Sequence, residues 1–374
     1  MERSSGMQFP HFKLLKLLLS SILMVSLISC VHVKVRTQKD DIHDIVSKAN
    51  ADFYLDDRIW YQDVHAEVSG KRIFLRGEAF FPQPVRGIAR KLKQAGYEQE
   101  VIDEVIYLPQ QFENGLNYGI ITVPYTMSRY EAVAEKKEGT ELLYGEPVRL
   151  IKDADPYIQV QSSVGYLGYI PKSDLRMVNL EDWKPYHSNE FAIFDKSINL
   201  ENGLEIKIAT RLPYLGDGRL LLADGSEISL SQDNFRVVDA AINPLRQAII
   251  NSGEQFLGLP YVWGGRSAEG LDCSGFVMQS YSMNNLYLPR DTDEMANVGR
   301  IIGFPGWTDA MLPGDLLFFA GGRRLVTHTA IYMGDGKVIH SLGSGVQIES
   351  MNPEDEDYAE KLTKRFIFAK RLFD

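Results

Sequence analysis

The chain has 374 residues, of which 44% are hydrophobic and 24% are charged, a length and composition that predict two to four globular domains. Its 50 acidic residues outnumber the 40 basic ones, for a net charge of −10, which excludes the basic footprint that a nucleic-acid-binding protein needs. The two cysteines allow at most one disulfide and exclude a disulfide-rich scaffold.

Residues 1–29 have the layout of a secretory signal, with basic residues before the apolar run 17–28. That run is short for a transmembrane anchor, which is the alternative. It ends L-I-S-C, which resembles the lipobox at which bacterial lipoproteins are cleaved and acylated. The resemblance implies that Cys30 carries lipid and leaves Cys273 a free thiol. The mature protein is then expected in the cell envelope, lipid-anchored at a periplasmic face or the cell surface.

Residues 30–50 are polar and charged, and we predict a tether there. Residues 51–112 are predicted to form a small αβ domain, because 64–68 and 72–77 alternate like strands and 85–95 has helical spacing. Residues 101–108 can be a helix or a strand. The segment G-K-R-I-F-L-R-G-E, followed by the predicted helix, resembles a BON module. It can bind envelope components or act as a spacer.

The pattern of residues 119–180 predicts short strands broken by turns. The segments E-L-L-Y-G-E-P-V-R-L and G-Y-L-G-Y-I belong to this pattern. They resemble a bacterial SH3 barrel. A linker and a second SH3-like barrel are predicted over 181–240, with hairpin turns at Gly216–Gly218 and Asp224–Gly225. An amphipathic helix over 243–257 is predicted to open the last domain, with four residues facing inward: Leu245, Ile249, Ile250 and Leu257.

Cys273 lies in Y-V-W-G-G-R-S-A-E-G-L-D-C-S-G-F-V, and the apolar run after it predicts a buried helix that begins at this cysteine. The unpaired N–H groups and positive dipole end of such a helix favour a thiolate nucleophile. The alternative is a buried structural cysteine.

Two histidines flank a predicted hairpin further along the chain. His328 opens T-H-T-A-I-Y-M-G and His340 closes K-V-I-H, with the turn signal G-D-G between them. A hairpin can place His328 beside Cys273 as a base, with His340 fixing its tautomer. A lone histidine on a strand is more often a core or surface residue, and that alternative applies to each of them.

The motifs D-C-S-G-F-V, L-P-G-D-L-L-F-F, T-H-T-A-I-Y-M-G and V-I-H stand in that order within residues 243–374. This region resembles the NlpC family of papain-like bacterial cell-wall peptidases. The resemblance implies a multidomain α+β protein with a papain-like catalytic domain and a Cys273–His328–His340 triad. It also implies hydrolysis of peptidoglycan stem peptides at a bond made by γ-D-glutamate.

Two SH3-like barrels before such a domain resemble the subgroup that cleaves between γ-D-glutamate and the diamino acid of peptides with a free N-terminal L-alanine. The resemblance implies that the first barrel closes one end of the cleft, where an acid and a tyrosine recognise the ammonium. Glu146 is the first candidate for the acid, with Glu141 and Tyr166 behind it. Each can equally be a residue of a barrel turn.

Further roles in the cleft follow from the chemistry and the resemblance. The Cys273 backbone N–H and, by resemblance, the Tyr261 hydroxyl are candidates to stabilise the oxyanion. Asp291 and Thr292, where the family usually has Ser, can bind substrate or form only a helix N-cap. The polar candidates for the γ-D-glutamyl group are Asp272, Ser274, Arg290, Asp291 and Thr292.

Two alternative functions remain: an amidase or endopeptidase acting on intact wall, and a non-catalytic envelope-binding lipoprotein. A complete Cys–His–His set counts against the second. No HxxxH or CxxC metal-ligand spacing occurs. We therefore expect no metal or cofactor, and a monomer whose partners are peptidoglycan-derived peptides and, through its lipid, a membrane.

Overall fold

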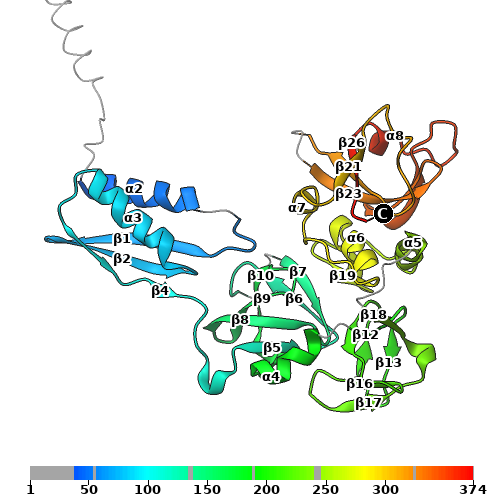
Figure 1. The fold of residues 1–374 in the computed structure, drawn as a ribbon, viewed down its shortest axis with the longest axis horizontal. Helices are drawn as coiled ribbons and strands as arrows, with labels where there is room; N and C mark the ends of the chain where they lie inside the picture. The colour runs from blue at the N-terminus through cyan, green and yellow to red at the C-terminus, as the bar shows by residue number, and fades with distance from the viewer. Residues whose placement is uncertain are drawn as a thin grey trace, which may run out of the picture.

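The computed structural model describes residues 38–53, 56–133, 138–187, 190–239, 246–322 and 326–373. The signal segment and Cys30 lie outside these residues. Figure 1 shows four bodies in chain order: an N-terminal module, a first barrel, a second barrel and a C-terminal domain. None of the described helices has the length and hydropathy needed to cross a bilayer.

The N-terminal module is a small sheet covered by two helices (Figure 1). The strand order is β1-β2-β3, with β1 antiparallel to β2 and with β3 and β4 parallel to it. The predicted strands and helix are confirmed, and residues 101–108 form strands. The elements are α2 (Gln38–Phe53), β1 (Gln62–Ser69), β2 (Arg72–Ala79), α3 (Pro82–Gln94), β3 (Glu100–Asp103) and β4 (Ile106–Tyr107).

The tether predicted over residues 30–50 is wrong from Gln38 onward, because α2 forms part of the core of this module. Apolar residues at helical spacing give α2 a face that packs on the sheet and on α3. Those residues are at most 2% exposed: Ile42, Val46 and Ala49.

The first barrel is an antiparallel sheet with the strand order β11-β5-β8-β9-β10-β6-β7. Its strands match the predicted range 119–180 except that β5 begins one residue earlier, at Tyr118. They are β5 (Tyr118–Ile121), β6 (Tyr125–Arg129), β7 (Glu138–Leu143), β8 (Pro147–Ala154), β9 (Tyr157–Gln161), β10 (Leu167–Pro171) and β11 (Leu175–Val178).

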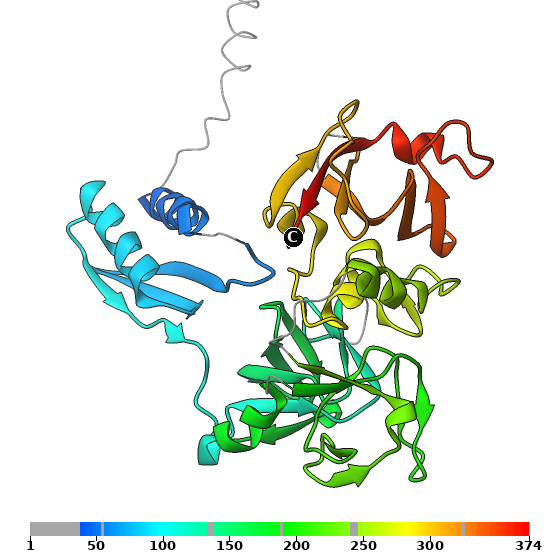
Figure 2. The ribbon, with the colours of Figure 1, turned by 45° about the vertical axis from the view of Figure 1, so that its right-hand side comes forward.

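A short helix, α4 (Leu180–Trp183), leads to the second barrel. The predicted turns flank and join the β16–β17 hairpin, where Asp217 and Gly225 adopt positive φ angles. The barrel begins at Glu190, within the range predicted for the linker and the second barrel, and it packs against the first barrel (Figure 2). Its strands are β12 (Glu190–Ile193), β13 (Ile198–Asn199), β14 (Glu205–Ile206), β15 (Arg211–Pro213), β16 (Arg219–Leu221), β17 (Glu227–Ser229) and β18 (Arg236–Asp239).

The C-terminal domain packs helices against an antiparallel sheet with the order β21-β26-β22-β23-β24-β25. The elements are α5 (Arg246–Glu254), β19 (Arg266–Ser267), β20 (Gly270–Leu271), α6 (Cys273–Ser282), α7 (Thr292–Met295), β21 (Arg300–Gly303), β22 (Leu316–Ala320), β23 (Val326–Gly334), β24 (Lys337–Leu342), β25 (Gly345–Ser350), α8 (Glu360–Thr363) and β26 (Phe366–Arg371).

The helix predicted to open this domain is present as α5, with Ile249 and Ile250 buried as expected. The expectation that Leu257 faces inward is wrong. Leu257 is 44% exposed, because α5 ends at Glu254 and the chain then leaves the helical register. Leu245 lies outside the described residues.

Candidate active site

The turn before α6 holds Cys273 at the first position of a buried helix, as predicted. Asp272 is the N-cap, and its Oδ1 accepts a hydrogen bond of 2.6 Å from the N–H of Gly275. A side chain at Gly275 is excluded, because its Cβ would lie 2.2 Å from the carbonyl oxygen of Gly265. The cysteine is 9% exposed.

The predicted hairpin is present as β23 and β24, and it packs against α6. Nε2 of His328 and Nδ1 of His340 are 3.0 Å apart. The backbone N–H of Thr329, the residue after His328, donates to the sulfur of Cys273. The fold therefore brings together Cys273, His328 and His340, and Nδ1 of His328 is the nitrogen not engaged by His340.

Glu349 extends this chain of contacts and was not predicted. Its Oε2 lies 2.8 Å from Nε2 of His340, and this hydrogen bond lowers the pKa of the Glu349 carboxyl. His340 pairs with Gln347 across β24 and β25, so Glu349 is its diagonal neighbour on the same face. The hairpin register was the signal that could have identified it.

The ionised Glu349 fixes the tautomers, because a carboxylate only accepts hydrogen bonds. Nε2 of a neutral His340 must then carry its proton, and its Nδ1 accepts from Nε2–H of His328. This leaves Nδ1 of His328 with a lone pair, the form that a general base for the thiol needs.

Burial keeps both the thiol and its base neutral at rest. Burial raises the pKa of the Cys273 thiol, and the Asp272 carboxylate raises it further. Hydrogen bonds from Thr292 and from the backbone of Thr329 and Ser274 lower this pKa, but their effect is smaller. The helix start therefore does not give the lowered thiol pKa that we expected. Burial also lowers the pKa of the neighbouring imidazole, that of His328, to about 3.

One hydroxyl group lies beside the sulfur, and a second lies within range of its charge. Oγ1 of Thr292 is 3.7 Å from Sγ of Cys273. Tyr261 lies close enough for a thiolate to raise the pKa of its phenol, a smaller effect than that of burial. The Tyr261 hydroxyl therefore stays protonated and can donate a hydrogen bond, as its predicted role at the oxyanion requires.

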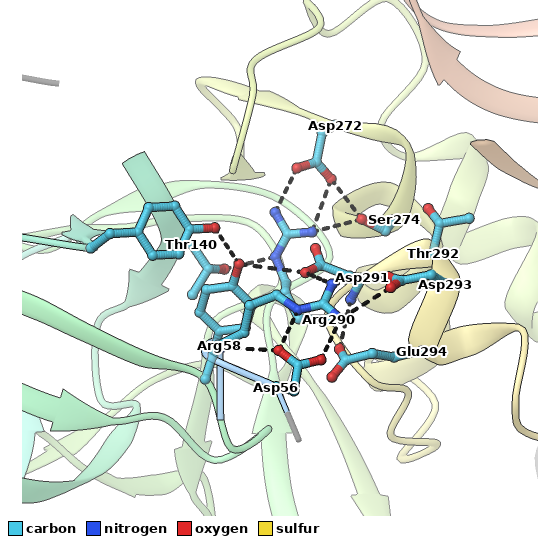
Figure 3. A network of polar contacts seen from close by, with 12 residues as sticks. Asp56, Arg58, Thr140, Asp272, Ser274, Arg290, Asp291, Thr292, Asp293 and Glu294 are labelled. Carbon is cyan, nitrogen blue, oxygen red and sulfur yellow. Dashed lines mark hydrogen bonds and ion pairs between the residues drawn. The ribbon is translucent and has the colours of Figure 1, made fainter. Parts of the chain in front are cut away.

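Asp272, Ser274 and Arg290 form a buried network instead of facing an open cleft (Figure 3). The Arg290 guanidinium donates to Asp272 at 3.0 and 2.6 Å and to Ser274 Oγ at 2.7 Å. Its Nε donates to Thr140 Oγ1 of the first barrel at 2.7 Å. The arrangement gives no support to the prediction that these three residues contact substrate, because their polar atoms bind one another and hold the nucleophile turn on the barrel.

Asp291 lies at the edge of this network, beside a tyrosine pair of the first barrel. Tyr166 donates to Oδ2 of Asp291 over 3.4 Å, and the hydroxyl groups of Tyr166 and Tyr130 are 2.6 Å apart. Asp291 is also the N-cap of α7, so the N-cap interpretation holds too. Its side chain is 27% exposed. Tyr130 was not predicted, since no local pattern marks it.

Glu146 and Glu141 lie elsewhere, at the joint between the first barrel and β19. Glu141 accepts hydrogen bonds from the backbone N–H of Arg266 and from Ser267 Oγ. Glu146 forms an ion pair with the Arg266 guanidinium and lines an interdomain cavity of about 380 Å³. Cys273, His328 and His340 do not line this cavity. The placement of these two acids at the ammonium site is therefore corrected, because their carboxylates already bind the C-terminal domain.

Among the described residues, no group of three or more His, Cys, Asp and Glu side chains is arranged to hold a metal ion. The groups that the candidate site offers for chemistry are the thiol, the imidazoles, the hydroxyl groups and the backbone N–H groups.

Comparison with protein families gives two matches. Residues 258–366 match the NlpC/P60 family, and residues 138–175 match the bacterial dipeptidyl-peptidase SH3 domain. The first match contains the candidate triad and the second contains Tyr166. The predicted resemblances to the NlpC family and to a bacterial SH3 barrel are confirmed, and with them the multidomain α+β fold.

Related proteins match over more than one domain. A gamma-D-glutamyl-L-lysine dipeptidyl-peptidase of Bacillus subtilis (strain 168) is 30% identical over 250 residues, 60% of this chain and 78% of that protein. A protein of the same name from Bacillus cereus is 28% identical over 247 residues, 59% of this chain and 72% of that protein. The crystal structure of an NlpC/P60 family protein from Bacillus cereus ATCC 10987 matches with a TM-score of 0.59 and 25% identity, covering 69% of this chain and 100% of that one.

Proposed function

The chain belongs to the NlpC/P60 family, and we propose that it is a cysteine peptidase that hydrolyses the bond between γ-D-glutamate and an L-diamino acid in peptidoglycan stem peptides. The observation that carries this proposal is the relay from Cys273 through His328 and His340 to Glu349. The names of the Bacillus relatives support the substrate class.

The first half of the reaction is acyl transfer to the sulfur. As Sγ of Cys273 attacks the carbonyl carbon, its proton passes to Nδ1 of His328. The oxyanion that forms accepts hydrogen bonds from the backbone N–H of Cys273 and from the Tyr261 hydroxyl. His328 then returns the proton to the amine of the diamino acid, which leaves, and a thioester remains on Cys273.

Water completes the cycle. His328 removes a proton from the water that attacks the thioester and gives it to the sulfur as the sulfur leaves. The γ-D-glutamyl acid that forms loses its remaining proton to solvent and becomes a carboxylate. Both half-reactions need Nδ1 of His328 unprotonated at the start, and its low pKa keeps it so at neutral pH. Glu349 and His340 keep the proton of His328 on Nε2 throughout.

We further propose that the substrates are fragments with a free N-terminal L-alanine, whose ammonium binds at Asp291 and Tyr166. The Asp291 carboxylate is partly exposed, and the first barrel places Tyr166 and Tyr130 around it. A partly exposed carboxylate attracts an ammonium group, and it rejects an N-acylated terminus that leaves its charge unpaired.

The localisation is proposed on sequence alone. The L-I-S-C segment supports lipid attachment at Cys30, and a chain anchored there would act in the cell envelope as a monomer on peptidoglycan-derived peptides. Incorporation of labelled fatty acid into the full chain, lost in Cys30→Ser, tests this. No incorporation into the unaltered chain would contradict it.

The function is tested with soluble protein that begins after Cys30. Incubation with L-Ala-γ-D-Glu-L-Lys and with the corresponding diaminopimelate peptide should release L-Ala-γ-D-Glu, identified by mass spectrometry. Cys273→Ala, with its folded state verified by circular dichroism, should release none. Release of a different fragment would identify another bond, and cleavage of intact sacculi but not of the peptides would favour an enzyme of the intact wall.

A further inference from the structure

A segment of the N-terminal module reaches the proposed ammonium site. Arg58 lies between α2 and β1, far in sequence from the C-terminal domain, yet its Nη1 donates to Oδ2 of Asp291 at 2.6 Å (Figure 3). Its backbone carbonyl accepts a hydrogen bond of 2.6 Å from the N–H of Leu167, the residue after Tyr166. The segment is thus fixed to the first barrel beside the same tyrosine.

Three carboxylates surround the Arg58 guanidinium and use its five N–H groups. Asp56 accepts from Nε at 2.8 Å and from Nη2. Asp293 accepts from Nη1 at 2.9 Å and from Nη2 at 3.0 Å. Asp291 accepts the fifth bond. A single positive charge therefore faces three negative ones, and the cluster keeps an attraction for a second cation.

The geometry points to Arg58 as an internal competitor of the substrate, which occupies Asp291 in the empty enzyme and yields it to the N-terminal ammonium of a substrate. This inference rests on the proposed function, in which Asp291 binds that ammonium. Release costs the guanidinium one of its five hydrogen bonds, because Asp56 and Asp293 retain the other four.

Asp291 sets the preference for a free amine, and Arg58 sets how tightly either peptide binds. A peptide with a free amine replaces the charge that it displaces, so the Asp291 carboxylate remains paired. An N-acetylated peptide offers no charge, so its entry would separate Arg58 from Asp291 and leave a carboxylate uncompensated. Because both kinds of peptide have to displace Arg58, its removal should strengthen the binding of both by a similar factor.

Steady-state kinetics of Arg58→Ala and Arg58→Lys test the inference, using the free and the N-acetylated L-Ala-γ-D-Glu-L-Lys. We expect Arg58→Ala to lower KM for the free tripeptide about fivefold at unchanged kcat, the factor of one partly exposed ion pair, and to improve kcat/KM for the N-acetylated peptide by a similar factor. Arg58→Lys should bring KM most of the way back to the wild-type value. Arg76, which forms ion pairs with Glu67 and Glu104 within the N-terminal module, is the matched control, and Arg76→Ala should change nothing. An unchanged or higher KM in Arg58→Ala would overturn the inference.

Hydrogen exchange gives a readout that is independent of turnover. In Cys273→Ala, the free tripeptide should accelerate exchange at residues 57–61 and at the amide of Leu167, because the arginine loosens from Asp291. Slower or unchanged exchange there, with the peptide bound, would contradict the displacement of Arg58. The failure of the proposed function and the failure of this inference can be told apart. If the wild-type enzyme cleaves neither peptide, the proposed function is wrong. The exchange experiment still tests the displacement of Arg58 in that case, because it needs only binding.

Discussion

Nε2 of His340 lies 2.8 Å from Oε2 of Glu349, at the end of the relay that begins at the thiol. This contact holds the imidazole pair in the tautomer that leaves a lone pair on His328. The carboxylate therefore acts on the chemistry through two histidines, without touching the substrate.

Glu349→Ala should lower kcat about tenfold, with KM unchanged, because His340 can then adopt either tautomer and only part of the enzyme holds an active His328. Steady-state kinetics with the tripeptide measure this. Glu360, an exposed glutamate of α8 paired with Lys364, provides the control, and Glu360→Ala should match the wild type. An unaltered kcat in Glu349→Ala would show that the relay ends at His340.

His328→Gln should weaken the dependence of stability on pH. The buried imidazole has a pKa of about 3 in the folded protein, against about 6.5 unfolded. The unfolded chain therefore binds the extra proton between these values, and the wild type loses stability as pH falls from about 6.5 toward 3. The loss amounts to at most about 5 kcal/mol over the whole window.

Urea unfolding at pH 8 and pH 4.5 measures this effect. The wild type should lose about 3 kcal/mol more than His328→Gln over that interval. Parallel pH profiles for the two proteins would contradict the burial of a neutral His328.

Thr292→Val should raise the pKa of the Cys273 thiol further, because the variant keeps the shape of the side chain but removes the hydroxyl 3.7 Å from the sulfur. The rate of alkylation by iodoacetamide as a function of pH reports the thiolate fraction. We expect its midpoint to move upward in Thr292→Val and to stay close to the wild-type value in Thr292→Ser. A downward movement in Thr292→Val would be inconsistent with a hydrogen bond that favours the thiolate.

Glu141→Ala should loosen the joint between the first barrel and the C-terminal domain. The buried carboxylate accepts from the N–H of Arg266 and from Ser267 Oγ, and both donors would be left without it, at a cost of about 2–4 kcal/mol. Urea unfolding measures the loss, with Glu181→Ala as a control because Glu181 is 78% exposed and paired only with Lys184 among the described residues. An equal stability for both variants would contradict a role for Glu141 in docking.

Local patterns were enough to predict the centre of the site. The D-C-S-G turn specifies a helix start, and the turn signal at Gly334–Gly336 specifies a hairpin whose strands carry His328 and His340. Each of these predictions depends on residues that are close in sequence, where periodicity and turn chemistry act directly.

The contacts that were missed join distant parts of the chain. Arg58 binds Asp291, although more than half of the sequence separates the two residues. The acid beside the barrel tyrosines is Asp291 instead of the predicted Glu146, which pairs with Arg266. Domain docking decides such pairs, and no local pattern encodes it. The apolar residues of α2 recur at helical spacing in the sequence, but the charged residues between them led to the prediction of a tether.

The most direct test of the ammonium site compares the free and the N-acetylated tripeptide as substrates of the wild type and of Asp291→Asn. We predict that the wild type prefers the free peptide by at least about a hundredfold in kcat/KM, the loss expected when a buried or partly buried charge is left unpaired. This preference should largely disappear in Asp291→Asn, while Cys273 remains reactive toward iodoacetamide. Equal cleavage of both peptides by the wild type would contradict recognition of a free N-terminus.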